Sequence, residues 1–169
     1  MDISSGIEYI YSKEILYLDI KAENILLSES RSTKIYDFGF SVRNTIDLVP
    51  FDRGIPTYTP LEFLCTSKRG RSADVWDCGL VIIYTLGIWP LLPPSKWTIA
   101  NIRTGKGDAA IKMLEWFENI ERSKKRIPDK YSLLLKMLTI DPSKRIISLD
   151  LVKNLCKAQV KALTRELLL

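Results

Sequence analysis

Apolar residues near the start of the chain recur every three or four positions. Ile7, Ile10 and Tyr11 follow this spacing, which predicts a helix over residues 4–13 with one apolar face. The period then changes. Residues 25–35 place two short apolar runs on either side of a polar turn, a pattern typical of a β hairpin.

The middle of the chain combines an irregular loop with a very apolar helix. Residues 37–62 show no period and carry several prolines, and a loop of this length is usually functional. Residues 78–94 carry no charge, but Gly87 and Pro90 interrupt them. The remaining helix, over residues 74–86, is too short to span a bilayer, so we expect it to lie in the centre of a folded domain.

The second half of the chain predicts more helices and no further strand. Candidate helices cover residues 98–101, 109–121 and 130–139, and Ser148 can cap a final helix. Packing of that last helix on the domain is favoured over binding to a partner. With no repeat and no linker, residues 1–169 are expected to form one unit, mostly α within the α+β class, as a helical bundle with a small β hairpin.

Charge adds little to this picture. The net charge is +5, and the two basic clusters, residues 68–71 and 122–126, are short. A solvated face is favoured for both over docking of an acidic partner or nucleic acid, because no aromatic residues interleave with them. We therefore expect no nucleic-acid partner and no membrane association.

The cysteines and the absent histidines exclude the commonest metal sites. Cys65, Cys78 and Cys156 are far apart with no CxxC pair, and the chain has no histidine. Lone thiols fit a reducing compartment, so a cytoplasmic or nuclear location is expected. The charged Asp2 and Glu8 leave no apolar region of the kind that a signal peptide requires.

The most informative chemistry lies between the first helix and the irregular loop. Asp19 can accept a proton from an attacking hydroxyl, and Lys21 can lie beside a transferred phosphoryl group. Asn24 and Asp37 offer oxygen ligands for Mg²⁺. Residues 19 and 21 face the same way on an extended loop, and a hairpin returns the chain so that Asp37 can lie beside Asn24. This order favours phosphoryl transfer over a solvated polar loop.

Five motifs in order then identify a family resemblance. Tyr17–Asn24 is similar to H-R-D-x-K-x-x-N, Asp37–Gly39 is D-F-G, and Gly54–Glu62 resembles G-T-x-x-Y-x-A-P-E. Asp74–Gly79 is similar to D-V-W-S-x-G, and Asp141–Arg145 is similar to D-P-x-x-R. The chain therefore resembles the C-terminal lobe of the eukaryotic protein kinases, and a protein-kinase-like C-terminal lobe is the expected fold.

The resemblance implies a role for each matching residue. Asp19 corresponds to the catalytic base, and Lys21 to the lysine that stabilises the phosphate and is typical of serine/threonine kinases. Asn24 and Asp37 correspond to the Mg²⁺ ligands. Leu26 corresponds to the residue beneath the adenine ring of ATP. ATP and Mg²⁺ are thus the expected cofactors, and serine or threonine residues of a protein are the expected acceptors.

Other matching residues imply structural roles. Tyr17 and Phe38 correspond to members of the apolar spine that links the two kinase lobes. Asp74 corresponds to the anchor beneath the catalytic loop, and Glu62 and Arg145 to a buried ion pair that holds the activation segment.

The chain also departs from the family pattern. Leu18 replaces the motif arginine that pairs with an activation-loop phosphate, and Ile55 replaces a threonine that bonds the catalytic acid and lysine. A local shift would allow Thr57 to take that threonine's place. Three stretches are nevertheless similar to the SH3-binding-domain kinase subgroup: residues 56–62, 116–117 and 126–128.

Only sixteen residues precede Tyr17, and they contain no Gly-rich loop and no strand lysine. The expectation is a single partial kinase domain over 1–169, with the N-lobe absent and the chain inactive alone. Leu26 and Phe38 would be partly uncovered, which predicts a missing segment or a protein partner over the cleft. The interpretation is a serine/threonine protein kinase domain; the alternative is an inactive kinase-like scaffold.

Overall fold

The computed structural model describes residues 3–29, 32–43, 48–50, 56–88 and 98–146. The helices are α1 (Ile3–Ser12), α2 (Leu61–Thr66), α3 (Arg71–Thr85), α4 (Ile99–Thr104), α5 (Ala109–Lys124) and α6 (Leu133–Met137). The short 3-10 turns are η1 (Ala22–Asn24), η2 (Pro56–Tyr58) and η3 (Asp129–Tyr131). The strands are β1 (Ile15–Leu16), β2 (Ile25–Leu27), β3 (Thr33–Ile35), β4 (Val42–Arg43), β5 (Leu48–Pro50) and β6 (Lys68–Gly70).

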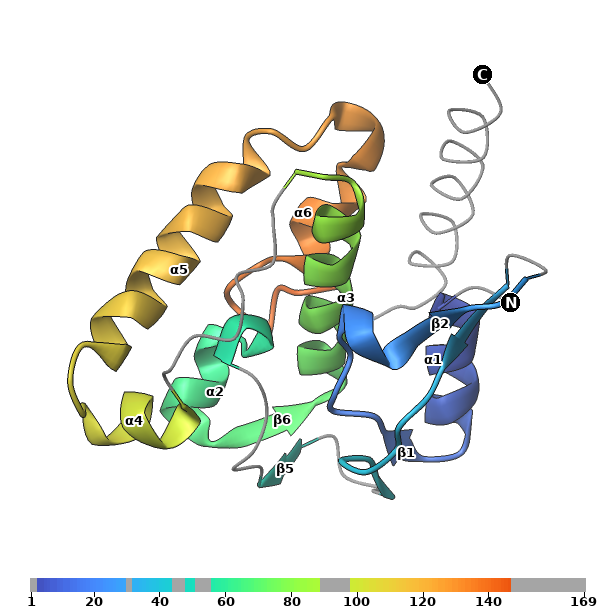
Figure 1. Cartoon of the computed structure of the whole chain (residues 1–169), viewed down its shortest axis with the longest axis horizontal. Coiled ribbons are helices and arrows are strands. Elements are labelled where there is room, and N and C mark those ends of the chain that lie inside the picture. The colour runs from blue at the N-terminus through green and yellow to red at the C-terminus, as the bar shows by residue number, and fades with distance from the viewer. Residues whose placement is uncertain (1–2, 30–31, 44–47, 51–55, 89–97, 147–169) are drawn as a thin grey trace.

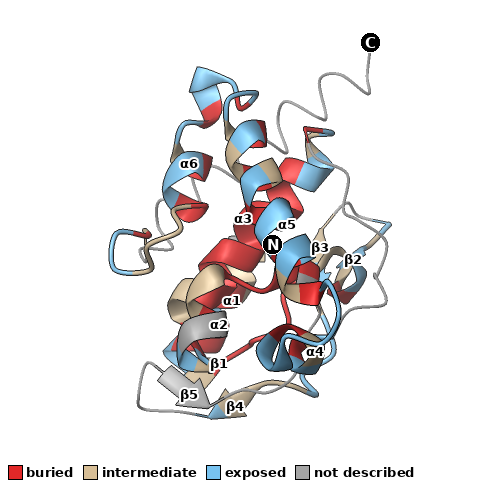
Figure 2. Ribbon diagram, turned by 90° about the vertical axis from the view of Figure 1, so that its left-hand side faces the viewer, coloured by how far each residue is buried: buried red, intermediate tan, exposed pale blue. Residues whose placement is uncertain are grey.

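Helix α3 is the centre of the fold. Every residue from Ala73 to Ile83 is buried, as expected for a helix that is apolar on all sides. Figure 1 shows α3 between α5 on one side and α1 on the other, and Figure 2 shows it almost wholly in the buried class. A Cβ at Gly79 would lie 2.9 Å from Leu138, so glycine permits α6 to pack closely against α3.

The predicted β hairpin is confirmed. Strands β2 and β3 are antiparallel, with Ile25 opposite Ile35 and Leu27 opposite Thr33. Two other small antiparallel pairs, β1 with β4 and β5 with β6, were not expected, because each strand is only two or three residues long. Small antiparallel sheets around a helical centre agree with the predicted α+β, mostly α class.

The predicted helices match α1, α3, α4, α5 and the η3–α6 segment, with boundary differences of a few residues. Ile7, Ile10 and Tyr11 are buried, which confirms the apolar face of the first helix. The helix predicted after Ser148 lies outside the described residues. No helix in the described ranges is both long enough and apolar enough to cross a bilayer.

Candidate active site

The loop that carries Asp19 is held from below by Asp74 of α3. The Asp74 carboxylate accepts hydrogen bonds from the backbone N–H groups of Tyr17 at 3.2 Å and Leu18 at 2.8 Å. It also accepts one from the Tyr11 hydroxyl at 2.9 Å. Leu18 has φ +66°, a conformation that a leucine rarely adopts, and the bonds to Asp74 hold the loop in it. The predicted anchoring role of Asp74 is confirmed.

The structure brings three predicted site residues together on this loop. The Asp19 carboxylate, only 6% exposed, accepts from Lys21 Nζ at 2.8 Å and from Asn24 Nδ2 at 2.8 Å. Asn24 Nδ2 also donates to the Asp19 carbonyl at 3.0 Å. These bonds use the amide nitrogen of Asn24 and leave its oxygen as the atom that can bind a cation.

The hairpin then returns the chain to the catalytic loop. The Tyr36 N–H donates to the Asn24 carbonyl at 3.1 Å, so Asp37 follows directly after a residue bonded to Asn24. The Tyr17 hydroxyl donates to the Tyr36 carbonyl, and the Tyr17 ring meets the Phe38 ring edge-on at 5.4 Å. Burial raises the pKa of Tyr17, which keeps this hydroxyl a donor. Contact between the two expected spine residues is thus confirmed.

Asp37 presents its carboxylate at the surface in a strained local turn. Its φ is +62°, and its Oδ1 accepts from the Gly39 N–H at 3.1 Å. Within the described residues, no three Asp, Glu, Cys or His side chains form a metal cluster. One carboxylate and one amide oxygen still fit Mg²⁺, which completes its shell with water and nucleotide phosphates.

The side of the site next to β2 is open. Leu26 and Phe38 are each 50% exposed, and Leu27 is 72% exposed. We call Leu26 and Phe38 the exposed face; Leu27 is the next residue of β2, so its side chain points to the opposite side of the strand. The prediction that Leu26 and Phe38 would be partly uncovered is confirmed, and an apolar surface beside charged residues is typical of a binding surface.

A turn of the irregular loop also contacts the catalytic loop. The Tyr58 hydroxyl accepts from the Ala22 N–H at 3.2 Å, and the Thr57 carbonyl accepts from the Trp116 indole N–H at 3.1 Å. Among the described residues, the Thr57 hydroxyl bonds neither Asp19 nor Lys21, so the proposed replacement of the motif threonine by Thr57 is not seen. Ile55 lies outside the described residues.

Two buried ion pairs support this arrangement. Arg145 Nη2 bonds Glu62 Oε2 at 3.0 Å, and the guanidinium lies over the Trp76 ring at 5.0 Å. That pair was predicted. The second pair joins Arg69 of β6 to Asp77 of α3, and both side chains are buried. Burial raises the pKa of the Asp77 carboxyl, and the charge of Arg69 opposes that rise.

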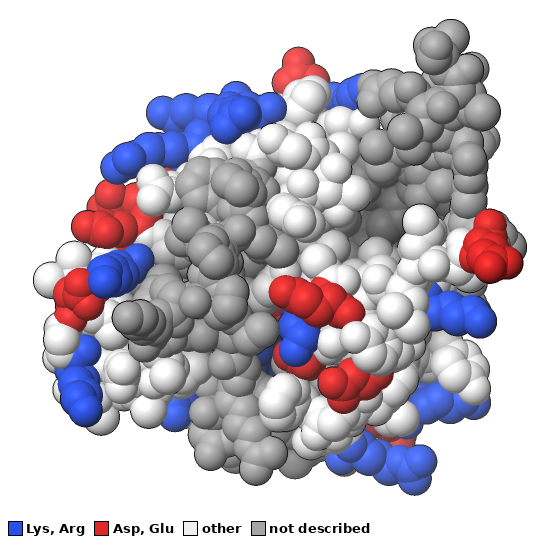
Figure 3. Space-filling view, in the orientation of Figure 1, with Lys and Arg blue, Asp and Glu red and all other residues white. Residues whose placement is uncertain are grey.

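The Arg69–Asp77 pair corrects the interpretation of residues 68–71 as a solvated face. Lys68 is exposed, but Arg69 is buried because it neutralises Asp77, which stands where the motif has serine. The other basic cluster is mostly solvated, as predicted. Arg122, Lys125 and Arg126 are exposed, and Lys and Arg gather near that end of α5 in Figure 3.

Comparison with known proteins identifies the family. The model of the protein kinase domain matches residues 1–157. A probable serine/threonine-protein kinase of Dictyostelium discoideum is 36% identical over 143 residues, which cover 83% of this chain and 16% of that protein. The yeast Saccharomyces cerevisiae cAMP-dependent protein kinase type 3 is 33% identical over 151 residues, covering 88% of this chain and 34% of that protein.

A third relative, an SNF1-related protein kinase catalytic subunit of Arabidopsis thaliana, is 33% identical over 150 residues, covering 85% of this chain and 27% of that protein. The chain belongs to the protein kinase family, and the Dictyostelium relative is named as a probable serine/threonine kinase. It spans between 16% and 34% of the length of these three relatives. The resemblance to the SH3-binding-domain kinase subgroup stays a prediction.

Proposed function

We propose that this domain transfers the γ-phosphoryl group of ATP to serine or threonine hydroxyls of a protein, with Asp19 as the catalytic base. The observation that carries the proposal is the position of the Asp19 carboxylate. It is nearly buried, fixed by Asn24, paired with Lys21 and next to the segment that presents Asp37. Kinase catalysis consists mainly of such positioning and charge compensation.

Each residue has a distinct part in the reaction. As the hydroxyl oxygen forms a bond to the γ-phosphorus, the bond to the bridging oxygen of ADP breaks and Asp19 accepts the hydroxyl proton. Lys21, 2.8 Å from Asp19, can turn toward the oxygens of the transferred group. Asn24 and Asp37 would hold Mg²⁺, which supplies positive charge against the phosphates. Leu26 would pack beneath the adenine ring.

The exposed face suggests that the 169-residue chain transfers phosphate poorly by itself. Leu26 and Phe38 offer apolar surface on one side of a nucleotide, and a second side is needed to exclude water. We infer that a further protein segment or a partner covers this face in the active enzyme.

One observation favours the alternative of an inactive scaffold. Leu18 is wholly buried at the position of the motif arginine, so the loop lacks that receptor for a phosphate on the activation segment. A scaffold would keep the fold and bind proteins through the exposed face without transferring phosphate.

The test is phosphoryl transfer from Mg²⁺·ATP to a basic serine peptide by the protein purified from its own cells. We expect transfer by the native protein, and a loss of at least about 1000-fold in Asp19→Asn with ATP affinity retained. Asp108→Asn, an exposed acid outside the site, is the control and should behave as wild type. Full activity in Asp19→Asn would refute the base assignment. No transfer by the native protein would favour the scaffold.

A further inference from the structure

Helix α5 buries two neighbouring aromatic rings, and one of them, Trp116, bonds the irregular loop. Met113, Trp116, Phe117 and Ile120 are buried at helical spacing, while Leu114 and other residues of the opposite face are exposed. The Trp116 ring carries one hydrogen-bond donor, and a buried indole N–H normally finds an acceptor. Its acceptor is the carbonyl of Thr57, 59 residues earlier in the chain.

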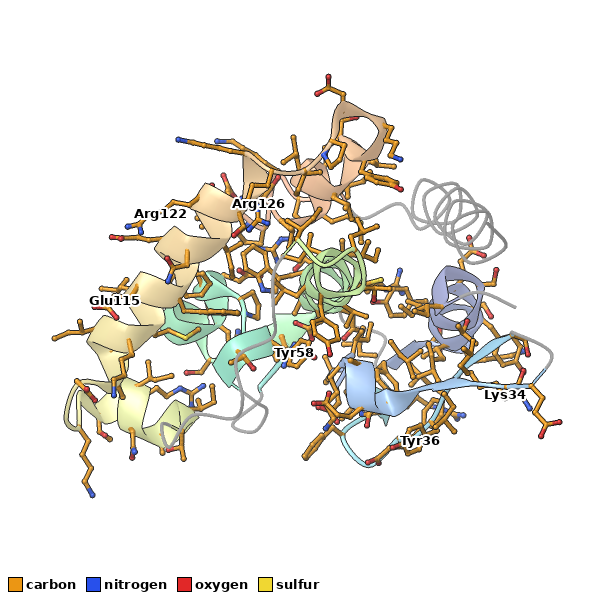
Figure 4. All side chains as sticks on the ribbon, turned by 45° about the horizontal axis from the view of Figure 1, so that its top comes forward. Lys34, Tyr36, Tyr58, Glu115, Arg122 and Arg126 are labelled. Atoms are coloured by element: carbon orange, nitrogen blue, oxygen red, sulfur yellow. The ribbon has the colours of Figure 1, made fainter. Side chains whose placement is uncertain are left out.

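The other end of the same turn is fixed to the catalytic loop. Tyr58, the residue after Thr57, accepts a hydrogen bond from the Ala22 N–H, and Ala22 follows Lys21 directly. Figure 4 shows Tyr58 between the α5 half of the molecule and the η1 turn. The η2 turn is therefore bonded on one side to α5 and on the other side to the loop that carries Asp19.

These two bonds matter more here because one family contact has no counterpart. The motif threonine that bonds the catalytic acid and lysine is Ile55, which has no hydroxyl. Within the described residues, the Thr57 hydroxyl makes no bond to Asp19 or Lys21 that would replace it. The Tyr58–Ala22 bond thus connects the turn to the catalytic loop, and the Trp116–Thr57 bond fixes the turn from behind.

We propose that Trp116 is a positioning residue for the protein substrate. It holds the η2 turn against the catalytic loop, so that the turn can contribute to the surface that binds the substrate peptide. This proposal rests on the proposed kinase function and adds a residue to it, one that lies on a helix outside the catalytic motifs.

The first experiment needs no catalysis. In the 169-residue chain, Trp116→Phe keeps a buried aromatic ring but removes the indole donor and part of the ring volume. We expect hydrogen exchange of the amides at residues 57–59 and 22 to rise about tenfold, with little change elsewhere. Phe117→Leu is the control, because it reduces the volume of the neighbouring buried ring, which packs against Trp76, and leaves the Trp116 donor in place. Exchange within twofold of wild type in Trp116→Phe, or an equal local rise in Phe117→Leu, would overturn the proposal.

The second experiment separates positioning from stability in the native protein. Trp116→Phe should raise the KM for a serine peptide about fivefold while kcat and the KM for ATP stay unchanged. Phe117→Leu should leave the peptide KM unchanged even where it lowers the melting temperature. A fall in kcat with an unchanged peptide KM would refute the substrate role. If the wild-type protein transfers no phosphate, the kinase function fails, and the exchange experiment alone decides whether Trp116 fixes the turn.

Discussion

The floor of the site and its exposed face are built in opposite ways. The floor is the loop around Asp19 together with Asp74 beneath it, and its polar groups are buried and hydrogen-bonded. The exposed face, Leu26 and Phe38, leaves half of each residue in solvent. The comparison shows which part of a kinase site this domain can fix by its own packing.

The difference follows from what burial demands of each group. A buried carboxylate such as Asp74 is tolerated only when donors surround it, so its partners are fixed along with it. An apolar side chain at the surface imposes no such demand and is stabilised only when something covers it. The contacts within this chain therefore fix the floor, whereas the exposed face would be stabilised only by contact with another surface.

The largest expected effect on stability comes from removing Arg145, the partner of Glu62. Arg145→Met would leave Glu62 without its cation and three carbonyls, of Ser72, Thr139 and Ile140, without their donor. We expect a loss of roughly 3–5 kcal/mol in the free energy of unfolding, measured in urea. Lys144→Met, an exposed neighbour, should change it by less than about 0.5 kcal/mol. A loss below about 1 kcal/mol in Arg145→Met would show that this ion pair contributes little to the stability of the domain.

A second test concerns the ion pair between Arg69 and Asp77, in which Asp77 stands at the position of the motif serine. Arg69→Met should cost about 3 kcal/mol, because Asp77 would be buried without its cation. The double variant Arg69→Met/Asp77→Ser restores the serine of the motif and should recover stability to within about 1 kcal/mol of wild type. If the losses of stability in Arg69→Met and in the single variant Asp77→Ser simply add up in the double variant, the two residues do not act as a pair.

The difference in stability between Arg69→Met and the double variant should depend on pH. Burial raises the folded-state pKa of Asp77 above its ordinary value. Protonation of this carboxyl therefore stabilises the folded state at low pH. This stabilisation disappears as the pH rises through the folded-state pKa. The stability gap between Arg69→Met and the double variant should therefore narrow on acidification, by up to about 1.4 kcal/mol per pH unit between the two pKa values. Thermal melts of both variants measure the gap; a gap independent of pH would contradict the buried, unpaired carboxylate.

The smallest effect on stability is expected at Leu27, an exposed residue of β2. Leu27→Ser should change the free energy of unfolding by less than about 0.5 kcal/mol, because its side chain is already in solvent. Leu16→Ala, which alters a buried residue, should cost about 2–5 kcal/mol in the same urea titration. A large loss of unfolding free energy in Leu27→Ser would indicate that the Leu27 side chain packs within the domain.

Local motifs made the floor predictable, and long-range partners did not. The spacing of Asp19, Lys21 and Asn24 on one loop, and the return of the hairpin to Asp37, follow from the sequence. Arg69 was misread because a charged residue among Lys68 and Arg71 resembles a surface loop; only the position of α3 shows that it is buried.

Trp116 gave a signal of a different kind. A large aromatic residue at helical spacing predicts burial, but its hydrogen-bond acceptor lies on a turn 59 residues away. Pairings across such a separation depend on the packed fold, which periodicity does not specify. The strand pair β5–β6 was missed for the same reason, since Lys68–Gly70 has no alternation of apolar and polar residues.

The most direct test of a floor that forms without a cover is amide hydrogen exchange of the 169-residue chain, resolved by residue and without nucleotide. The Leu18 amide, bonded to Asp74, should exchange as slowly as the core of α3, to within about tenfold. The Gly39 amide, bonded to the exposed Asp37, should exchange at least about 100-fold faster. Exchange of Leu18 as fast as that of Gly39 would show that the catalytic loop is not fixed by this domain alone.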